Sequence, residues 1–113
     1  MENHRLVLPA HLNHYGFVFG GYLLAWVDEV AYLAACSEFP GCRFVTVAMD
    51  DVEFKKSVRE GTILHFNSER VRLGTTSVTY RVTVRRDEDE EIFSNQVVMV
   101  NVDDRGQKLP IPK

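Results

Sequence analysis

Asp28 has the setting in this sequence that most clearly favours chemistry. It lies two turns into an apolar segment, directly after Val27 and two residues before Val30. A buried carboxylate is costly unless it is paired, hydrogen-bonded or faces a cleft, and one that faces a cleft can act as a general base. The alternative is that Asp28 or Glu29 is simply the solvent-exposed edge of a helix. Glu29 is the weaker candidate for chemistry, because it lies about 100° away around the helix and could itself form that edge.

A glycine pair and a polar loop precede this segment. Gly20 and Gly21 stand at its start, where free backbone N–H groups favour negative charge and would stabilise an oxyanion. Asn13, in the loop before them, could orient a water molecule or donate to a carbonyl group. Both features also have a common structural explanation, since glycine pairs suit tight corners and an Asn near Gly commonly forms a turn. The residues alone do not decide between these explanations.

Other candidate sites are weaker. His11 and His14 have no cysteine or carboxylate at a matching spacing, which argues against a metal site. No nucleophile elbow, phosphate-binding loop or dinucleotide-binding motif occurs in the chain. Ser77 follows a glycine turn rather than a nucleophile motif, and we expect it to line a groove or cap a turn. Cys36 and Cys42 lie six positions apart, which leaves a disulfide open, although Cys36 is predicted to be a packing residue.

The 113 residues are predicted to form one domain, residues 1–113. The net charge of -3 gives no basic surface for nucleic acid. Residues 20–37 approach the length of a membrane span, but two acidic residues at the middle of the segment argue against one. The N-terminus lacks the layout of a signal peptide, so we expect a cytoplasmic protein with no membrane partner.

The spacing of apolar residues predicts one helix and five strands. The helix covers residues 22–38 and is apolar on nearly all sides, which predicts that it is buried. A short strand at residues 4–8 should precede it, and a charged turn is expected at residues 87–90. The remaining predicted strands are residues 44–52, 62–72, 78–85 and 92–102. In the third of these, Val and Tyr alternate strictly with Thr and Arg, so one face should be buried and the other solvated.

A single curled sheet around one helix satisfies both patterns. The predicted fold class is therefore α+β with the hotdog architecture, in which one long central helix is wrapped by a curled antiparallel sheet of about five strands. A sheet this small leaves an open edge and part of the helix uncovered. We therefore expect dimerisation by pairing of edge strands.

In this order and spacing, these features resemble the acyl-CoA thioester hydrolase branch of the hotdog superfamily, which includes the YciA-type and cytosolic acyl-CoA hydrolases. That branch carries Asn-x-x-Gly, then a glycine pair, then a helix with an acidic residue two turns later. The likeness covers most of the chain. The matching segments are Asn13-His14-Tyr15-Gly16, Gly20-Gly21, Asp28, Val45-Thr46-Val47, Val52-Glu53-Phe54 with Gly61, and Leu73-Gly74-Thr75-Thr76-Ser77.

The resemblance implies hydrolysis of an acyl-CoA to the free acid and CoA, with no metal and no redox cofactor. It implies that Asp28 is the general base or the nucleophile and that Asn13 positions the attacking water or the thioester. The backbone N–H of Gly21 would polarise the carbonyl. In the family these groups meet across an interface, so a homodimer is the expected minimum unit, and tetramers or hexamers are expected above it.

The resemblance also implies substrate contacts. The implied substrate-binding residues are Gly20, Thr46, Gly74, Thr75, Thr76 and Ser77. The cations available for the CoA phosphates are Lys55, Lys56, Arg72, Arg105 and Lys108.

Two alternative functions stay open. One is a non-catalytic acyl-CoA-binding module, and a weaker one is a hotdog hydratase or dehydratase that uses a histidine from the loop of His11 and His14.

Overall fold

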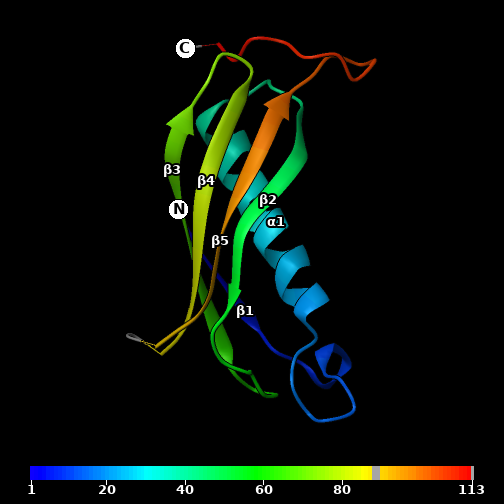
Figure 1. Ribbon diagram of the computed structural model, residues 1–113, viewed down its shortest axis with the longest axis vertical. Coiled ribbons are helices and arrows are strands. Elements are labelled where there is room, and N and C mark those ends of the chain that lie inside the picture. Colours follow the sequence, from blue (N-terminus) through cyan, green and yellow to red (C-terminus); the bar gives the residue numbers. More distant parts are fainter. Residues whose placement is uncertain (88–89, 113) are drawn as a thin grey trace.

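The computed structural model describes residues 1–87 and 90–112 (Figure 1). The five strands form one antiparallel sheet in the order β1-β3-β4-β5-β2, and α1 lies across one face of it. This arrangement confirms the predicted α+β hotdog architecture. The elements along the chain are β1 (Glu2–Leu6), the short 3-10 helix η1 (Pro9–His11), α1 (Gly20–Glu38), β2 (Phe44–Phe54), β3 (Ile63–Leu73), β4 (Ser77–Arg86) and β5 (Glu90–Asn101).

The observed bounds differ from the predicted ones mainly at the start of the helix and in the first strand. The helix begins at Gly20, two residues early, because the glycine pair forms its first turn after Phe19 as N-cap. The first strand covers residues 2–6, where residues 4–8 were predicted. It ends before Val7, whose N–H donates to the carbonyl of Thr62 in the loop before β3. The turn predicted at residues 87–90 lies partly outside the described residues.

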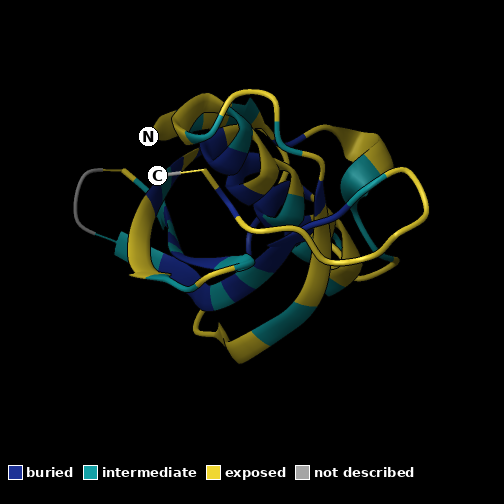
Figure 2. Ribbon diagram, turned by 90° about the horizontal axis from the view of Figure 1, so that it is seen from above, coloured by how far each residue is buried: buried dark blue, intermediate teal, exposed yellow. Residues whose placement is uncertain are grey.

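The core lies between α1 and the concave face of the sheet. The helix residues buried there are Leu23, Trp26, Val27, Val30, Ala31, Ala34 and Ala35. On β4, Val78, Tyr80, Val82 and Val84 are each no more than 2% exposed. This confirms the predicted alternation except at Thr79, which was expected on the solvated face and is 7% exposed. Figure 2 shows the helix buried toward the sheet and exposed on its other side. The exposed side agrees with the expectation that a sheet this small leaves part of the helix uncovered.

Edge strand β2 is irregular and apolar. It pairs with β5 through two β-bulges, and the second of these places Asp51 at a φ of 57°. Its exposed apolar side chains are Val45, Val47, Val52 and Phe54. An exposed apolar edge strand is a template for pairing with another chain. This edge is therefore a surface on which a second copy can add.

Helix α1 is too short or too polar to cross a membrane, and the concave face of the sheet carries a buried polar side chain. Among the described residues, no helix combines the length and hydropathy that a membrane span requires. Asn95 of β5 lies opposite Val82 of β4 on the concave face and is fully buried. Neither polar atom of its carboxamide has a hydrogen-bond partner in the described structure. The concave face is thus apolar with isolated polar side chains.

The alternation of β3 gives a paired stability test. Leu64 is 0% exposed and Ile63 is 55% exposed. Leu64→Ala should lower the free energy of unfolding by about 2–5 kcal/mol, because it removes buried methyl groups and leaves a cavity. The matched control Ile63→Ala should cost about 1 kcal/mol or less. Urea unfolding at one protein concentration, followed by the fluorescence of Trp26, measures both. Equal losses would contradict the assignment of the two faces.

Candidate active site

Asp28 faces the edge of the sheet, where it meets Thr46. The Thr46 hydroxyl Oγ1 donates to Oδ1 of Asp28 at 2.5 Å. The helix packs Val27 fully into the core, so the next residue lies at the boundary of the buried stripe, and Asp28 is half-buried there. No described residue donates to Oδ2 of Asp28. The carboxylate is thus held by one oxygen while the other is available to a water molecule or a substrate.

Glu29 has a different environment from its neighbour. Its Oε1 accepts from Nη2 of Arg5 at 3.1 Å, and the two side chains are 57% and 36% exposed. Such exposed pairs contribute little to stability. Glu29 is therefore the solvent-facing acidic residue of this helix, and Asp28 is the half-buried one that contacts the edge strand of the sheet.

The two glycines at the start of α1 have different surroundings. A Cβ added to Gly20 would lie 3.1 Å from the ring of Phe54, so this position must be small for β2 to pack against the helix. A Cβ added to Gly21 would meet nothing within 4 Å. The backbone at Gly21 lines a hollow of about 340 Å³ that Tyr22 also lines. The first-turn N–H groups of an α-helix have no partner within the helix, so the Gly21 N–H is accessible from this hollow.

The side chain of Asn13 is oriented by its own loop. Oδ1 accepts the backbone N–H groups of Tyr15 at 2.9 Å and Phe17 at 3.2 Å. The structural explanation for this Asn as a turn former is therefore correct. The same contacts leave the two N–H donors of Nδ2 without a partner in the described structure. Asn13 is thus a fixed side chain with a free amide donor.

Asn13, Gly21 and Asp28 do not come together within one chain. Asp28 lies seven positions after Gly21 on the α-helix, a rise of about 10 Å. Asn13 lies in the loop that precedes α1, beyond Gly21. A single carbonyl group cannot be within hydrogen-bond distance of both ends of this span. One chain therefore provides the carboxylate and the donors at two separate places.

The two histidines of the loop have structural contacts. Nδ1 of His11 accepts the backbone N–H of Leu8 at 3.0 Å, and its ring packs on Trp26 with centroids 4.8 Å apart. His14 packs on the ring of Tyr15 with centroids 3.9 Å apart. Within residues 1–87 and 90–112, no three His, Cys, Asp or Glu side chains gather as metal ligands. The loop thus gives no support to the hydratase alternative.

The segment from Gly74 to Ser77 forms the turn between β3 and β4. The Gly74 N–H donates to the carbonyl of Ser77 at 2.8 Å. The carbonyls of Thr75 and Thr76 accept N–H groups from the C-terminal part of the chain, at 2.8 and 2.9 Å. Strand β5 separates β4 from the strand that carries Thr46. Within one chain, this turn is therefore separated from Asp28 and Thr46, and its role in substrate binding stays a prediction.

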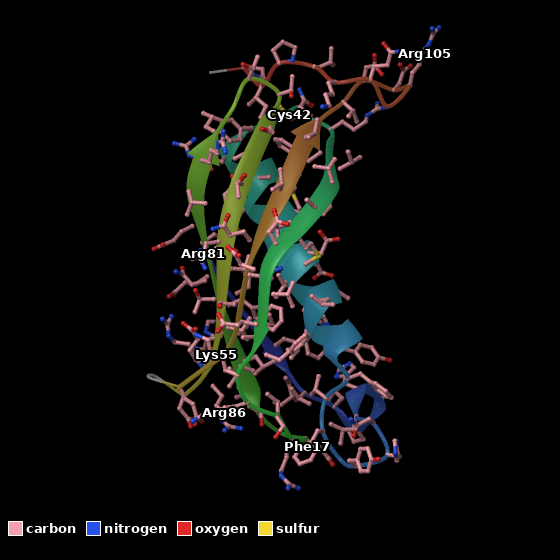
Figure 3. The ribbon with its side chains drawn as sticks, in the orientation of Figure 1. Phe17, Cys42, Lys55, Arg81, Arg86 and Arg105 are labelled. Carbon is pink, nitrogen blue, oxygen red and sulfur yellow. The ribbon has the colours of Figure 1, made fainter. Side chains whose placement is uncertain are left out.

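The candidate cations for CoA lie in separate regions. Lys55 and Lys56 line a hollow of about 280 Å³ beside Gly20. They pair with Glu91 and Glu90. Figure 3 shows Arg105 at the opposite end of the molecule from Lys55.

The contact between Thr46 and Asp28 is the feature of the site that the sequence did not reveal. The residues are eighteen positions apart, on a helix and on an edge strand. The resemblance implied that Thr46 binds substrate, and it implied no contact between Thr46 and the acid. The only local signal was a hydroxyl among the valines of a strand, which is common in β-sheets.

Comparison with known proteins identifies the family. Residues 15–93 match the family model described as Thioesterase superfamily. Mouse acyl-coenzyme A thioesterase 11 is 35% identical over 80 residues, which are 71% of this chain and 13% of that protein. The uncharacterized acyl-CoA thioester hydrolase YkhA of Bacillus subtilis is 28% identical over 114 residues, which cover 95% of this chain and 64% of the relative. The chain thus spans less than two thirds of the length of either relative.

Solved structures give the same family. An acyl-CoA hydrolase of Staphylococcus aureus, in complex with butyryl coenzyme A, coenzyme A and coenzyme A disulfide, superposes with a TM-score of 0.89 and 30% identity over 99% of this chain and 71% of that one. A hexameric hotdog fold thioesterase of Campylobacter jejuni has a TM-score of 0.87 and 32% identity over 97% of this chain and 88% of that one. The chain therefore belongs to the thioesterase superfamily and has the hotdog fold.

Proposed function

We propose that this protein hydrolyses an acyl-CoA thioester to a free acid and CoA, with Asp28 as the reactive carboxylate. The observation that carries the proposal is the hydrogen bond from Thr46 to Asp28 at 2.5 Å, at the open edge of the sheet. It orients a half-buried carboxylate and leaves one of its oxygens without a donor among the described residues. A carboxylate held in this way can take a proton from water or attack a carbonyl itself.

The chemistry can follow either of two routes. In the first, Asp28 accepts a proton from water as the water oxygen attacks the thioester carbonyl. In the second, Asp28 attacks first, CoA leaves as the thiolate, and water then hydrolyses the mixed anhydride. In both routes the carbonyl oxygen gains negative charge, which a backbone N–H such as that of Gly21 would stabilise. The amide donor of Asn13 would position the water or the thioester.

Two observations support a site shared between two copies of the chain. Gly21 and Asp28 of one chain are about 10 Å apart along the helix, so the donors that serve Asp28 must come from elsewhere. The exposed apolar edge of β2 lies directly beside Asp28 through Thr46. A second copy related by a two-fold axis at this edge would bring its own Gly21 and Asn13 toward Asp28. The minimum active unit is then a dimer, and the hexameric relative favours further assembly.

The Staphylococcus aureus enzyme supports the assignment of roles. It has been solved with alanine in place of one aspartate, one asparagine and one threonine. Its altered asparagine precedes its altered aspartate by fifteen positions, the spacing between Asn13 and Asp28. Its altered threonine follows the aspartate by seventeen positions, one fewer than the eighteen between Asp28 and Thr46. The same three residue types thus stand in the same order in both chains.

Substitution of the carboxylate tests the proposal directly. Asp28→Asn keeps the shape of the side chain but removes the base, so kcat for CoA release should fall at least about 100-fold. The matched control Glu29→Gln changes the adjacent, exposed acid and should keep kcat within about two-fold of wild type. A thiol-trapping assay measures both, and circular dichroism with size-exclusion chromatography checks the fold and assembly. A wild-type rate in Asp28→Asn would remove this residue from the mechanism.

The role of Thr46 can be separated from its packing. Thr46→Val keeps the β-branched shape and removes the hydroxyl that orients Asp28, so kcat should fall about 10-fold or more, as expected for loss of a charge-assisted hydrogen bond. Thr46→Ser restores the hydroxyl and should recover most of the rate. If Thr46→Val keeps the wild-type rate while Thr46→Ser loses it, the methyl group and not the hydroxyl of Thr46 is what the site needs.

A mixture of two inactive variants tests the shared site. Asn13→Asp keeps an oxygen that can accept the two loop N–H groups but removes the amide donor. In a refolded equal mixture with Asp28→Asn, half of the dimers are mixed, and each mixed dimer contains one intact site if the sites are shared. The mixture should then recover about a quarter of the wild-type activity. If each site lies within one chain, the mixture stays as inactive as its components.

A further inference from the structure

A third cavity lies on the side of α1 opposite to Asp28. It has a volume of about 490 Å³ and opens between the C-terminal half of α1 and strands β3 and β4. We call it the β3 pocket. Strands β4 and β5 separate β3 from β2, which carries the Thr46 contact to Asp28. The residues that line it are Met1, Ala34, Ser37, Glu38, Ser68, Arg70 and Tyr80. The N-terminal ammonium of Met1 donates to the carbonyl of Ser68 at 2.9 Å.

The floor and the rim of the β3 pocket differ in character. Ala34, Ser68 and Tyr80 form the floor and are only 5%, 4% and 2% exposed. The methyl group of Ala34 and the ring of Tyr80 give an apolar surface there. Glu38 and Arg70 stand at the exposed rim. The cavity thus suits a molecule with an apolar body and one polar or charged end, and its volume is in the range of small-molecule sites.

At the rim, the carboxylate of Glu38 contacts the side chains of Tyr80 and Arg70. The Tyr80 hydroxyl donates to Oε1 of Glu38 at 2.5 Å, and Nη1 of Arg70 lies 3.1 Å from Oε2. Burial and the bond to Glu38 raise the pKa of Tyr80, so this hydroxyl stays a donor at neutral pH. The Arg70 guanidinium also lies over the ring of Phe39, 5.7 Å from its centroid. These contacts orient Arg70 and leave most of its five N–H donors available to a ligand.

Ser68 provides a second donor on the same wall. Its hydroxyl oxygen is buried and has no hydrogen-bond partner in the described structure. Ser68 and Arg70 are two positions apart on β3, so their side chains leave the same face of the strand about 6–7 Å apart. A buried hydroxyl without a partner is destabilising. A ligand oxygen would satisfy it if the wall between these two side chains opens, because the hydroxyl oxygen is closed to solvent in the described structure. Two adjacent donors, one of them cationic, match the two oxygens of a carboxylate.

We propose that the β3 pocket binds a small carboxylic acid with an apolar body. The carboxylate accepts hydrogen bonds from Ser68 and Arg70, and the apolar body lies on Ala34 and the ring of Tyr80. A cationic ligand is disfavoured because the Tyr80 hydroxyl and Arg70 already occupy both oxygens of Glu38. The acid released by hydrolysis of an acyl-CoA belongs to this ligand class, and that connection alone rests on the proposed function.

Three six-carbon probes with different end groups test the ligand class. Hexanoate, 1-hexanol and hexylamine are titrated into the full chain and followed by amide chemical shifts in NMR. Hexanoate should saturate and shift the signals of Ala34, Ser68 and Arg70, while the other two probes should bind at least about 10-fold more weakly. Stronger binding of hexylamine, or hexanoate shifts confined to the region of Asp28 and Thr46, would overturn the proposal.

Substitutions separate the β3 pocket from the proposed active site. Ser68→Ala removes an unpartnered hydroxyl, and Arg70→Gln removes the charge, so each should weaken hexanoate binding at least about 10-fold. Arg72→Gln is the matched control on the same strand and should leave the affinity unchanged. Asp28→Asn should also leave it unchanged, so loss of thioesterase activity and loss of this site are distinguishable. Wild-type affinity in both Ser68→Ala and Arg70→Gln would rule the pocket out as the binding site.

Discussion

The packing of α1 on the concave face of the sheet is the interaction on which the rest of this structure depends. Burial of apolar surface is the dominant favourable term in folding, and here it fixes the rotation of the helix about its axis. Val27 and Ala31 are fully buried against the sheet. Asp28 is therefore about 100° around from the buried centre, at the line where the sheet ends. The position of the candidate carboxylate is a consequence of core packing.

The same packing leaves one chain incomplete. A five-stranded sheet covers one side of the helix, so Tyr22, Tyr32 and Leu33 on its other side remain exposed. The β2 edge is apolar and open as well. Asp28 lies at this open boundary, where a carboxylate can remain partly hydrated and still contact Thr46. The helix is incompletely covered and the Asp28 carboxylate is accessible for the same reason, because the sheet ends beside the helix.

Polar groups on the concave face differ in how they are accommodated. The Tyr80 hydroxyl meets Glu38 at the rim of the β3 pocket, so its burial is compensated by a charge-assisted hydrogen bond. The Ser68 hydroxyl lines the same cavity without a partner, and Asn95 is buried opposite an irregular part of β2 that offers it none. Each such unpaired group costs about 1–3 kcal/mol. Burial of the apolar core stabilises the fold enough to offset the cost of these unpaired polar groups.

The sequence by itself determined the elements and their buried faces. Period-two alternation identified β4 and its inward valines, and the apolar run after the glycine pair identified α1, because these patterns are encoded by neighbouring residues. The motif from Asn13 to Asp28 indicated the family for the same reason. Only the tertiary structure decided that Asp28, and not Glu29, lies against the edge strand, and that Thr46 is its partner. Those contacts join residues from different elements, and they depend on strand register and helix rotation, which no local pattern encodes.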